Sequence, residues 1–358
     1  MQRIKWILSI GIIKISHWEY WPTSLVFAPL GLYWVWMGLK ARSFYFMSAA
    51  NPGIHTGGFV MESKRDVYAL LPGRLYPETL YIDKRNDDPG LVSLAGLSSA
   101  YRKNISFPCV AKPDIGMQGL GVKKIRNEEE LQLYCQNMPF PFLIQSYIDY
   151  PNEAGIFYHR HPNEARGKIS GIALKEFAFV TGNGRDTVET LVRQNKRYKL
   201  YWESIARELG DQVHIVLRDG ETMKLLDYGN HARGSKFTDG THLINAKLEN
   251  LLNEICVRIP GFYIGRLDIK YNTWEELSEG RNFSIIELNG SGSNPTHIYD
   301  PGHSILFAWK EMARHWRLIY RIARYNHIHK DIAYLGFGEG VREVLAQGKI
   351  KKTLRKLL

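Results

Sequence analysis

Residues Ala111–Val122 read AKPDIGMQGLGV, a lysine followed by a glycine-rich loop. Lys112 comes directly after an apolar run, FPCVA at residues 107–111, that predicts a strand. The loop holds three glycines: Gly116, Gly119 and Gly121. Glycines let a backbone approach phosphate oxygens and offer successive N–H donors, while a lysine adds a mobile positive charge. Neither the GxxxxGK[ST] nor the GxGxxG spacing is present. We therefore expect a glycine-rich β-hairpin over a nucleotide, with an ordinary turn as the alternative.

Two later segments carry paired polar residues. In GRLDI (265–269), Arg266 and Asp268 are two residues apart, and in IIELN (285–289) Glu287 and Asn289 have the same spacing. Residues two apart on a strand share one face. Neighbouring strands would therefore present three oxygen ligands suited to Mg²⁺ beside a guanidinium suited to phosphoryl charge: Asp268, Glu287 and Asn289 beside Arg266. The alternative is a half-exposed sheet surface, which the adjacent apolar runs disfavour because charges at the ends of buried strands need partners.

The hydrophobic pattern around these motifs alternates strands and helices. It predicts helices at residues 128–136, 187–195 and 246–258, and strands at 142–147, 169–180, 263–269 and 283–288. The fold class is therefore α/β (α+β).

Composition limits the class of protein. The 358 residues contain 44% hydrophobic and 23% charged side chains, which excludes disorder, collagen-like repeats and a polytopic membrane protein. The net charge of +11 favours an anionic partner. The cysteines Cys109, Cys135 and Cys256 are far apart, which excludes a disulfide scaffold and indicates a reducing, cytoplasmic compartment. There is no RNA-binding signature in the central region, so we expect no nucleic-acid partner.

Taken together, these motifs resemble the ATP-grasp ligases and are similar to those of D-alanine–D-alanine ligase and cyanophycin synthetase. The resemblance covers about residues 60–305. Its segments occur in the family's order: Ser63-Lys64 with LYPETLYI, VAKP and the glycine loop, FLIQSYI, VTGNGRDTVETLVRQNKRY, HARGS, GRLDIK and IIELNGSGSNP. The resemblance implies an ATP-grasp fold, in which two α/β subdomains grip a nucleotide.

The resemblance also implies roles for individual residues. The phosphates of ATP would be held by Lys64, Lys112 and the loop glycines. The adenine site would be lined by Gln145, Tyr147 and Ile148, and Glu153 would take the ribose or a substrate amine. Two Mg²⁺ ions, with Mn²⁺ as an alternative, would be bound by Asp268, Glu287 and Asn289.

Three arginines are candidates for the chemistry itself. By resemblance, Arg266 would steady the γ-phosphate and Arg233 would face the acyl-phosphate oxyanion. Arg160, in the segment His159–Pro162, is a candidate carboxylate clamp because its planar fork of donors matches a carboxylate.

The activity implied is an ATP-dependent carboxylate–amine ligase that acts through an acyl phosphate, releasing ADP and phosphate. The alternatives are an ATP-grasp phosphotransferase and a catalytically retired nucleotide-binding protein at a membrane surface. Two departures from the family stand out: the segment before Lys112 is too short and apolar for a full N-terminal α/β domain, and Gln145 replaces a commonly acidic residue. The partners would be small-molecule carboxylate and amine substrates, which the sequence does not identify. A homodimer is an open alternative.

The chain divides by composition into three stretches: residues 1–48 are apolar and aromatic, 49–308 alternate helices and strands, and 309–358 are basic and helical. The resemblance implies a further division of the middle stretch, into a reduced N-terminal part with the first nucleotide lysine (49–106) and an ATP-grasp core (107–308).

The segment Trp21–Leu39 contains 19 residues without a charge, with Pro29 expected to break or kink a helix in its middle. It predicts a membrane-interfacial hairpin or, as the alternative, a buried core hairpin.

The last stretch, residues 309–358, contains 12 Lys+Arg and four Asp+Glu, a net charge of 12 − 4 = +8. An arginine stripe at helical spacing lies beside an aromatic stripe: Arg314, Arg317, Arg321 and Arg324 beside Trp309, Ala313, Trp316, Tyr320 and Ala323. With the N-terminal segment, this predicts peripheral attachment to the anionic inner face of the cytoplasmic membrane. The alternative is an aromatic stripe docked on the core with solvated arginines.

Overall fold

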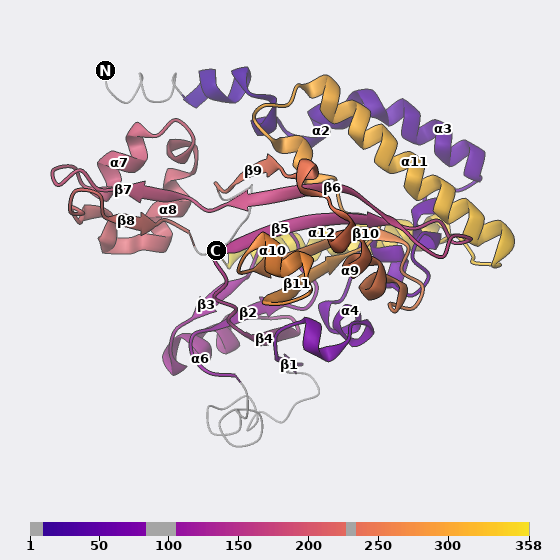
Figure 1. Ribbon diagram of the computed structural model, residues 1–358, viewed down its shortest axis with the longest axis horizontal. Coiled ribbons are helices and arrows are strands. Elements are labelled where there is room, and N and C mark those ends of the chain that lie inside the picture. Colours follow the sequence, from indigo (N-terminus) through magenta and orange to yellow (C-terminus); the bar gives the residue numbers. More distant parts are fainter. Residues whose placement is uncertain (1–9, 84–104, 227–233, 358) are drawn as a thin grey trace.

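The structure is a computed structural model that describes residues 10–83, 105–226 and 234–357. Its frame is two antiparallel sheets, one through the centre of the molecule and one at the lower left of Figure 1. The central sheet has the strand order β11-β10-β5-β6-β9. Its strands are β5 (Asn152–His159), β6 (Lys168–Glu176), β9 (Lys236–Asp239), β10 (Ile264–Tyr271) and β11 (Phe283–Asn289).

The smaller sheet has the order β1-β4-β2-β3. Its strands are β1 (Thr79–Ile82), β2 (Cys109–Pro113), β3 (Lys123–Ile125) and β4 (Phe142–Ser146). Helix α6 (Glu128–Asn137) packs against it and is capped by the preceding residue Asn127, whose side chain accepts a hydrogen bond from the Glu130 N–H. Its core includes the fully buried side chain of Leu354, which comes from the C-terminal helix α12 (Phe337–Lys356).

The two faces of the central sheet are covered by different helices. Adjacent residues of a strand point to opposite faces. Ile156 of β5 lies in a core with three helices: α4 (Lys64–Leu70), α9 (Ala246–Val257) and α10 (Trp274–Ser278). Phe157 points the other way and meets the ring of His315 on helix α11 (Ile305–His329) at 5.9 Å. Helix α11 covers only part of this face.

The N-terminal segment lies along α11 as a single run of helix. Helix α2 (Thr23–Phe27) passes through a 3-10 turn at Ala28–Leu30 into helix α3 (Gly31–Ala41). The irregularity expected at Pro29 is confirmed, because proline cannot donate the helical hydrogen bond. The predicted hairpin is wrong: the chain continues in one direction.

A third unit lies at the left of Figure 1. It pairs β7 (Phe179–Thr181) with β8 (Thr222–Lys224) and carries helices α7 (Val188–Gln194) and α8 (Trp202–Leu209) around its own apolar cluster. The single strand predicted at 169–180 is therefore two strands. The chain leaves the central sheet after β6 and forms β7, which pairs with β8.

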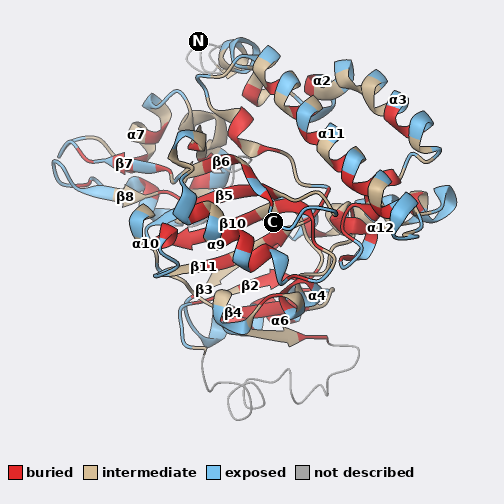
Figure 2. Cartoon of the chain, turned by 45° about the vertical axis from the view of Figure 1, so that its right-hand side comes forward, coloured by how far each residue is buried: buried red, intermediate tan, exposed pale blue. Residues whose placement is uncertain are grey.

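Most predicted elements agree with the structure within three residues at each end. Figure 2 shows that the buried residues concentrate in the two larger sheets and on the inner sides of the helices. The basic C-terminal stretch is two helices, each packed on a sheet, and so belongs to the same body as the core. All three cysteines are buried and free, as expected without disulfides.

Candidate functional site

A cavity of about 770 Å³ lies between the two larger sheets. The central sheet supplies the polar ends of β10 and β11, and the smaller sheet supplies Lys112 and the loop that follows it. The N-terminal segment forms a further wall through Glu19, Tyr20 and Trp21. The cavity brings together most of the predicted site residues: Lys64, Lys112, Gly116, Gly119, Gln145, Tyr147, Ile148, Glu153, Arg266, Asp268, Glu287 and Asn289.

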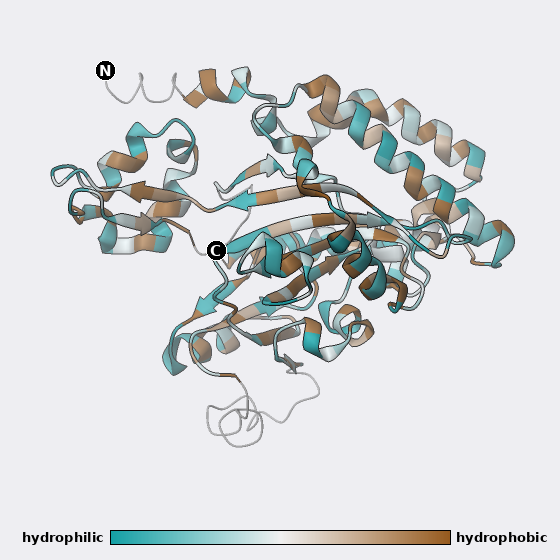
Figure 3. Ribbon diagram, viewed as in Figure 1, coloured by the Kyte–Doolittle hydropathy of each residue, from teal (hydrophilic) through white to brown (hydrophobic). Residues whose placement is uncertain are grey.

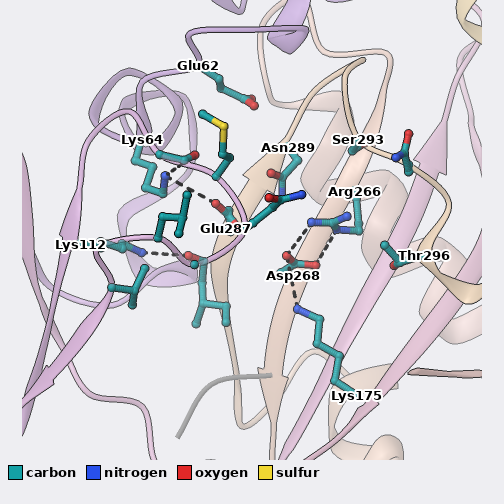
Figure 4. A pocket seen from close by; sticks show the side chains of 18 of the residues that line it. Glu62, Lys64, Lys112, Lys175, Arg266, Asp268, Glu287, Asn289, Ser293 and Thr296 are labelled. Atoms are coloured by element: carbon teal, nitrogen blue, oxygen red, sulfur yellow. Dashed lines mark hydrogen bonds and ion pairs between the residues drawn. The ribbon is translucent and has the colours of Figure 1, made fainter. Parts of the chain in front are cut away.

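The prediction that these two segments form neighbouring strands, β10 and β11, is confirmed. Asp268 lies opposite Glu287, and Arg266 lies opposite Asn289, in an antiparallel register. All four side chains are therefore on one face of the sheet, in the part of that face that α11 leaves uncovered (Figure 4). Gly155 of β5 makes room for them, because a Cβ at this residue would lie 3.0 Å from Asp268 Oδ1.

Asp268 is the centre of a buried network of charges. Arg266 Nε lies 2.8 Å from Asp268 Oδ1, and Arg266 Nη2 lies 3.1 Å from Oδ2. Lys175 Nζ lies 3.5 Å from the same Oδ2 (Figure 4). Burial works against ionisation of Asp268, but these two cations hold its pKa below the ordinary value.

Lys175 also neutralises Glu153, the residue expected to contact a ribose or an amine. Their side chains lie opposite each other on β5 and β6, with Lys175 Nζ 2.6 Å from Glu153 Oε1. Sequence reasoning missed Lys175. Its signal was a lone charge in the apolar run GIALK of a predicted strand.

Lys112 connects the two sheets from a buried position. Its Nζ donates to Gln145 Oε1 at 2.8 Å, to Tyr68 Oη at 2.7 Å and to the Ile286 carbonyl of β11 at 3.2 Å. Burial lowers the pKa of Lys112 to about 8, which the nearby Glu287 carboxylate opposes. The ammonium is thus held at the floor of the cavity by neutral acceptors.

Lys64 reaches the same floor from another element. It is the first residue of α4, which begins after the cap Ser63, and its Nζ lies 3.6 Å from Glu287 Oε1. The same ammonium lies 3.4 Å from the Asp114 carbonyl, where the glycine loop starts. Lys64 therefore links the loop of the smaller sheet to the acidic end of β11 (Figure 4).

The loop after Lys112 is the β-hairpin that the sequence predicts. Strands β2 and β3 pair antiparallel on its two sides. Gly119 and Gly121 have φ values of 68° and 74°, which L side chains rarely adopt. Gly121 does not line the cavity. Its part is to turn the chain beside Leu354, where a Cβ would meet a side-chain carbon at 3.2 Å.

The residues predicted around adenine form one side of the cavity. The Gln145 side chain is engaged on both ends, since it accepts from Lys112 and donates to Thr79 Oγ1 at 2.8 Å. The Tyr147 ring lies below Lys124 Nζ, 4.2 Å from the ring centre. The Ile148 carbonyl accepts from Lys270 Nζ at 2.9 Å.

Glu62 is a site residue that sequence reasoning missed. It lines the cavity two residues before Lys64, and it accepts a hydrogen bond from the Gly290 N–H at 3.1 Å. Burial, together with repulsion from Glu287, raises the pKa of Glu62 to about 8. Its position beside Lys64 in the segment MESK was the available signal.

The loop that carries Glu62 is fixed by a buried asparagine. Asn51 Nδ2 donates to the Ile264 carbonyl at 2.8 Å, and its Oδ1 accepts from the Tyr263 and Ile264 N–H groups. Gly58 then passes so close to the turn after β11 that a Cβ would lie 2.6 Å from Gly290 Cα. This approach places Glu62 next to the end of β11.

Arg160 does not belong to the site. It lies beyond the end of β5, where its guanidinium stacks 4.8 Å above the Tyr263 ring and donates to the Glu164 carbonyl. It does not line the cavity, so the structure does not bring this candidate carboxylate clamp together with the other predicted site residues. Arg233 lies outside the described residues.

The side chains at the ends of β10 and β11 suit a divalent cation. Asp268, Glu287 and Asn289 are hard oxygen donors. The Asn289 amide nitrogen is buried and has no hydrogen-bond partner among the residues that the structure describes. A half-turn of the amide would direct its oxygen there instead. Within the described ranges, no three His, Cys, Asp and Glu side chains form a metal cluster, so a cation at this site would need the asparagine or a phosphate as a further ligand.

Comparison with solved structures gives similarity, at low sequence identity, to two ligases and a synthetase. The VanG D-Ala:D-Ser ligase from Enterococcus faecalis is 13% identical, with 75% of this chain and 64% of that chain covered at a TM-score of 0.40. The D-alanine–D-alanine ligase from Bacillus anthracis complexed with ATP is 14% identical, with 75% and 69% covered at 0.40. A bifunctional glutathione synthetase from Pasteurella multocida is 15% identical at 0.38, and the chain spans 38% of its length. No family model and no curated protein sequence matches the chain.

Proposed function

We propose that this protein is an ATP-dependent ligase of the ATP-grasp type, which joins a small-molecule carboxylate to an amine through an acyl phosphate. One observation carries the proposal. The pairs Arg266–Asn289 and Asp268–Glu287 on the central sheet face Lys112 and a glycine hairpin of the smaller sheet across one cavity. Oxygen ligands on one wall and phosphate-binding groups on the other are what phosphoryl transfer requires.

The nucleotide would lie between the two sheets. When bound, ATP supplies the phosphoryl group that activates a carboxylate, and Mg²⁺ neutralises phosphate charge. Lys112, Lys64 and the hairpin N–H groups would hold the phosphates, and Tyr147 with Ile148 would contact the base. Asp268, Glu287 and Asn289 would hold the cations.

Arg266 and Lys175 are positioned to exchange partners. Both are now paired with Asp268, and both line the cavity. A phosphate at this position would attract the basic side chains of Arg266 and Lys175. A cation would attract the Asp268 carboxylate. The buried network would thus place positive charge, already dehydrated, where negative charge develops.

Glu62 is suited to accept a proton from the ammonium group of the second substrate, which frees the amine that attacks the acyl phosphate. A carboxyl group with a pKa near 8 on the cavity wall is partly ionised at neutral pH. The turnover number of the wild type should rise through this ionisation, and the Glu62→Gln variant should lack that rise.

The test is an assay of the purified protein with ATP, Mg²⁺ and pools of carboxylates and amines. Phosphate release is measured together with mass spectrometry of the products. An amide formed in equal amount with phosphate supports the ligase. A stable phosphorylated product identifies a phosphotransferase instead, and thermal stabilisation by ATP–Mg²⁺ without turnover identifies a nucleotide-binding protein without catalysis.

A further inference from the structure

Helix α3 has two apolar faces, and only one of them is covered. The inner face packs on the core through Met37, which is fully buried, and through Trp34, whose ring meets Trp316 of α11 edge-on at 5.0 Å. The outer face carries an apolar stripe at positions i, i+3, i+4 and i+7. Its members and their exposed fractions are Leu32 (82%), Val35 (43%), Trp36 (47%) and Leu39 (65%).

Aromatic and cationic side chains border this stripe. Arg317 Nε of α11 donates to Tyr33 Oη at 3.2 Å, and the Tyr33 ring stacks on Trp36 with centres 5.7 Å apart. Lys40 Nζ lies 4.0 Å above the Trp36 ring. Tyrosine, tryptophan and basic residues in contact at the edge of an apolar surface are typical of the headgroup region of a bilayer.

Helix α11 adds a row of charge beside α3. Its aromatic residues Trp316 and Tyr320 pack on the core, so the aromatic half of the sequence prediction follows the docked alternative. Its arginines are exposed to solvent along one face: Arg314, Arg317, Arg321 and Arg324. Figures 1 and 3 show α3 and α11 side by side at the edge of the molecule opposite the smaller sheet.

We propose that the outer face of α3 and the arginine row of α11 form one surface that attaches the protein to an anionic lipid bilayer. The apolar stripe enters the interface between headgroups and acyl chains, and the arginines contact lipid phosphates. This goes beyond the proposed ligase function and does not depend on it.

The attachment is in the plane of the bilayer and does not span it. The run Thr23–Ala41 is long and apolar enough to cross a membrane by length and composition alone. However, Val26 and Met37 are buried in the core, and Trp309 Nε1 donates to the Val26 carbonyl at 2.7 Å. Spanning would require these contacts to be broken, whereas lying flat uses only the exposed stripe.

A second copy of the chain fits this surface less well. A stable dimer buries about 800 Å² on each partner, more than four partly exposed side chains offer. A two-fold contact through α3 would also bring two arginine rows close together, and like charges repel. A bilayer with acidic headgroups complements both parts of the surface.

The test is flotation of the full chain with vesicles of phosphatidylcholine alone or mixed with phosphatidylglycerol. The wild type should float with the mixed vesicles at low salt and much less with the neutral ones. The double variant Leu32→Gln/Leu39→Gln should lower the partition coefficient roughly tenfold or more, because two apolar side chains no longer enter the interface. Leu133→Gln, on an exposed residue of α6 at the far side of the molecule, is the matched control and should float like the wild type.

The charge contribution is tested separately. Arg321→Gln/Arg324→Gln should weaken binding to mixed vesicles and flatten its salt dependence, while Arg185→Gln, on the exposed surface of the third unit, should not.

Unchanged thermal midpoints would show that every variant folds. The proposal is overturned if the wild type does not float, or if Leu32→Gln/Leu39→Gln floats equally well. It is also overturned if the wild type sediments as a dimer that this double variant abolishes, since the stripe would then be a subunit interface.

Discussion

Arg266 binds both carboxylate oxygens of Asp268, at 2.8 and 3.1 Å, two residues along the same strand. Asp268, which has the chemistry of a metal ligand, is therefore paired with Arg266, which is suited to hold phosphate. The cations of Arg266 and Lys175 together already neutralise the Asp268 carboxylate. We expect nucleotide and metal to separate the pair, so that binding and rearrangement of this network occur together.

The first prediction concerns the stability of this network. Lys175→Met would leave Glu153 without its partner at 2.6 Å and Asp268 with Arg266 alone. Removing one member of a buried ion pair leaves uncompensated charge, and we expect a loss of roughly 3–5 kcal/mol in the free energy of unfolding. Urea denaturation at pH 7 measures it. Lys247→Met, at an exposed lysine paired with Glu279, is the control and should change little.

Adding Glu153→Gln to Lys175→Met should recover part of that loss, because the unpaired carboxylate is then neutral. A Lys175→Met protein as stable as the wild type would show that the network is not the buried charge system described above.

The second prediction concerns the cation ligands. Glu287→Gln keeps the size of the side chain but removes the negative charge opposite Asp268, so ATP-dependent turnover should fall to background while the fold is kept. Thermal stabilisation by ATP should also lose its dependence on Mg²⁺. Glu279→Gln, at the exposed residue that follows helix α10, should behave like the wild type. Full activity in Glu287→Gln would remove this residue from the metal site.

Much of this site could be predicted from the sequence because it depends on strand periodicity. Spacing predicts that Asp268 shares one face of its strand with Arg266, and Glu287 one face of its strand with Asn289. The register of β10 and β11 brings the two pairs together. Lys175 and Glu62 could not be found in this way. Lys175 acts through a cross-strand partner on β5, and Glu62 reaches the site because Asn51 fixes its loop against the distant residue Ile264. Such long-range contacts leave no periodic pattern in the chain.

The N-terminal segment shows a different limit. Its apolar composition fits a buried hairpin and an interfacial helix equally well. What separates the two is the packing of α11, which covers Met37 and leaves Leu32 and Leu39 exposed. When a helix is apolar on all sides, its sequence does not indicate which face will pack on the core and which will stay exposed.

The third prediction concerns the glycine hairpin. Gly121 has a φ of 74°, so Gly121→Ala should strain the turn by about 1–2 kcal/mol and weaken closure of the hairpin over phosphate. In the wild type, ATP with Mg²⁺ should slow proteolytic cleavage within residues 114–122. The variant should show less protection at the same nucleotide concentration. Gly73→Ala, at a glycine with open space around it, is the control. Cleavage that is unaffected by nucleotide in the wild type would separate this loop from the binding site.

The last prediction is a pH dependence of stability that arises from Glu62. Its pKa is raised to about 8, first by burial and then by the Glu287 charge, from an ordinary value of 4.5. A carboxyl group whose pKa is higher in the folded state favours folding fully at pH values below the unfolded pKa, and this contribution is lost as the pH rises towards the folded pKa.

Glu62→Gln cannot ionise, yet its amide oxygen can still accept from the Gly290 N–H. The free energy of unfolding of the wild type, relative to this variant, should therefore fall between pH 5 and pH 8.5. We expect a change of about 1 kcal/mol or more, since the side chain retains some exposure to water. Chemical denaturation of both proteins across that range measures this change. Glu129→Gln, at an exposed residue of α6, is the control, and its free energy of unfolding should follow that of the wild type at every pH. A constant difference between wild type and Glu62→Gln would mean that Glu62 ionises as freely in the folded protein as in the unfolded chain.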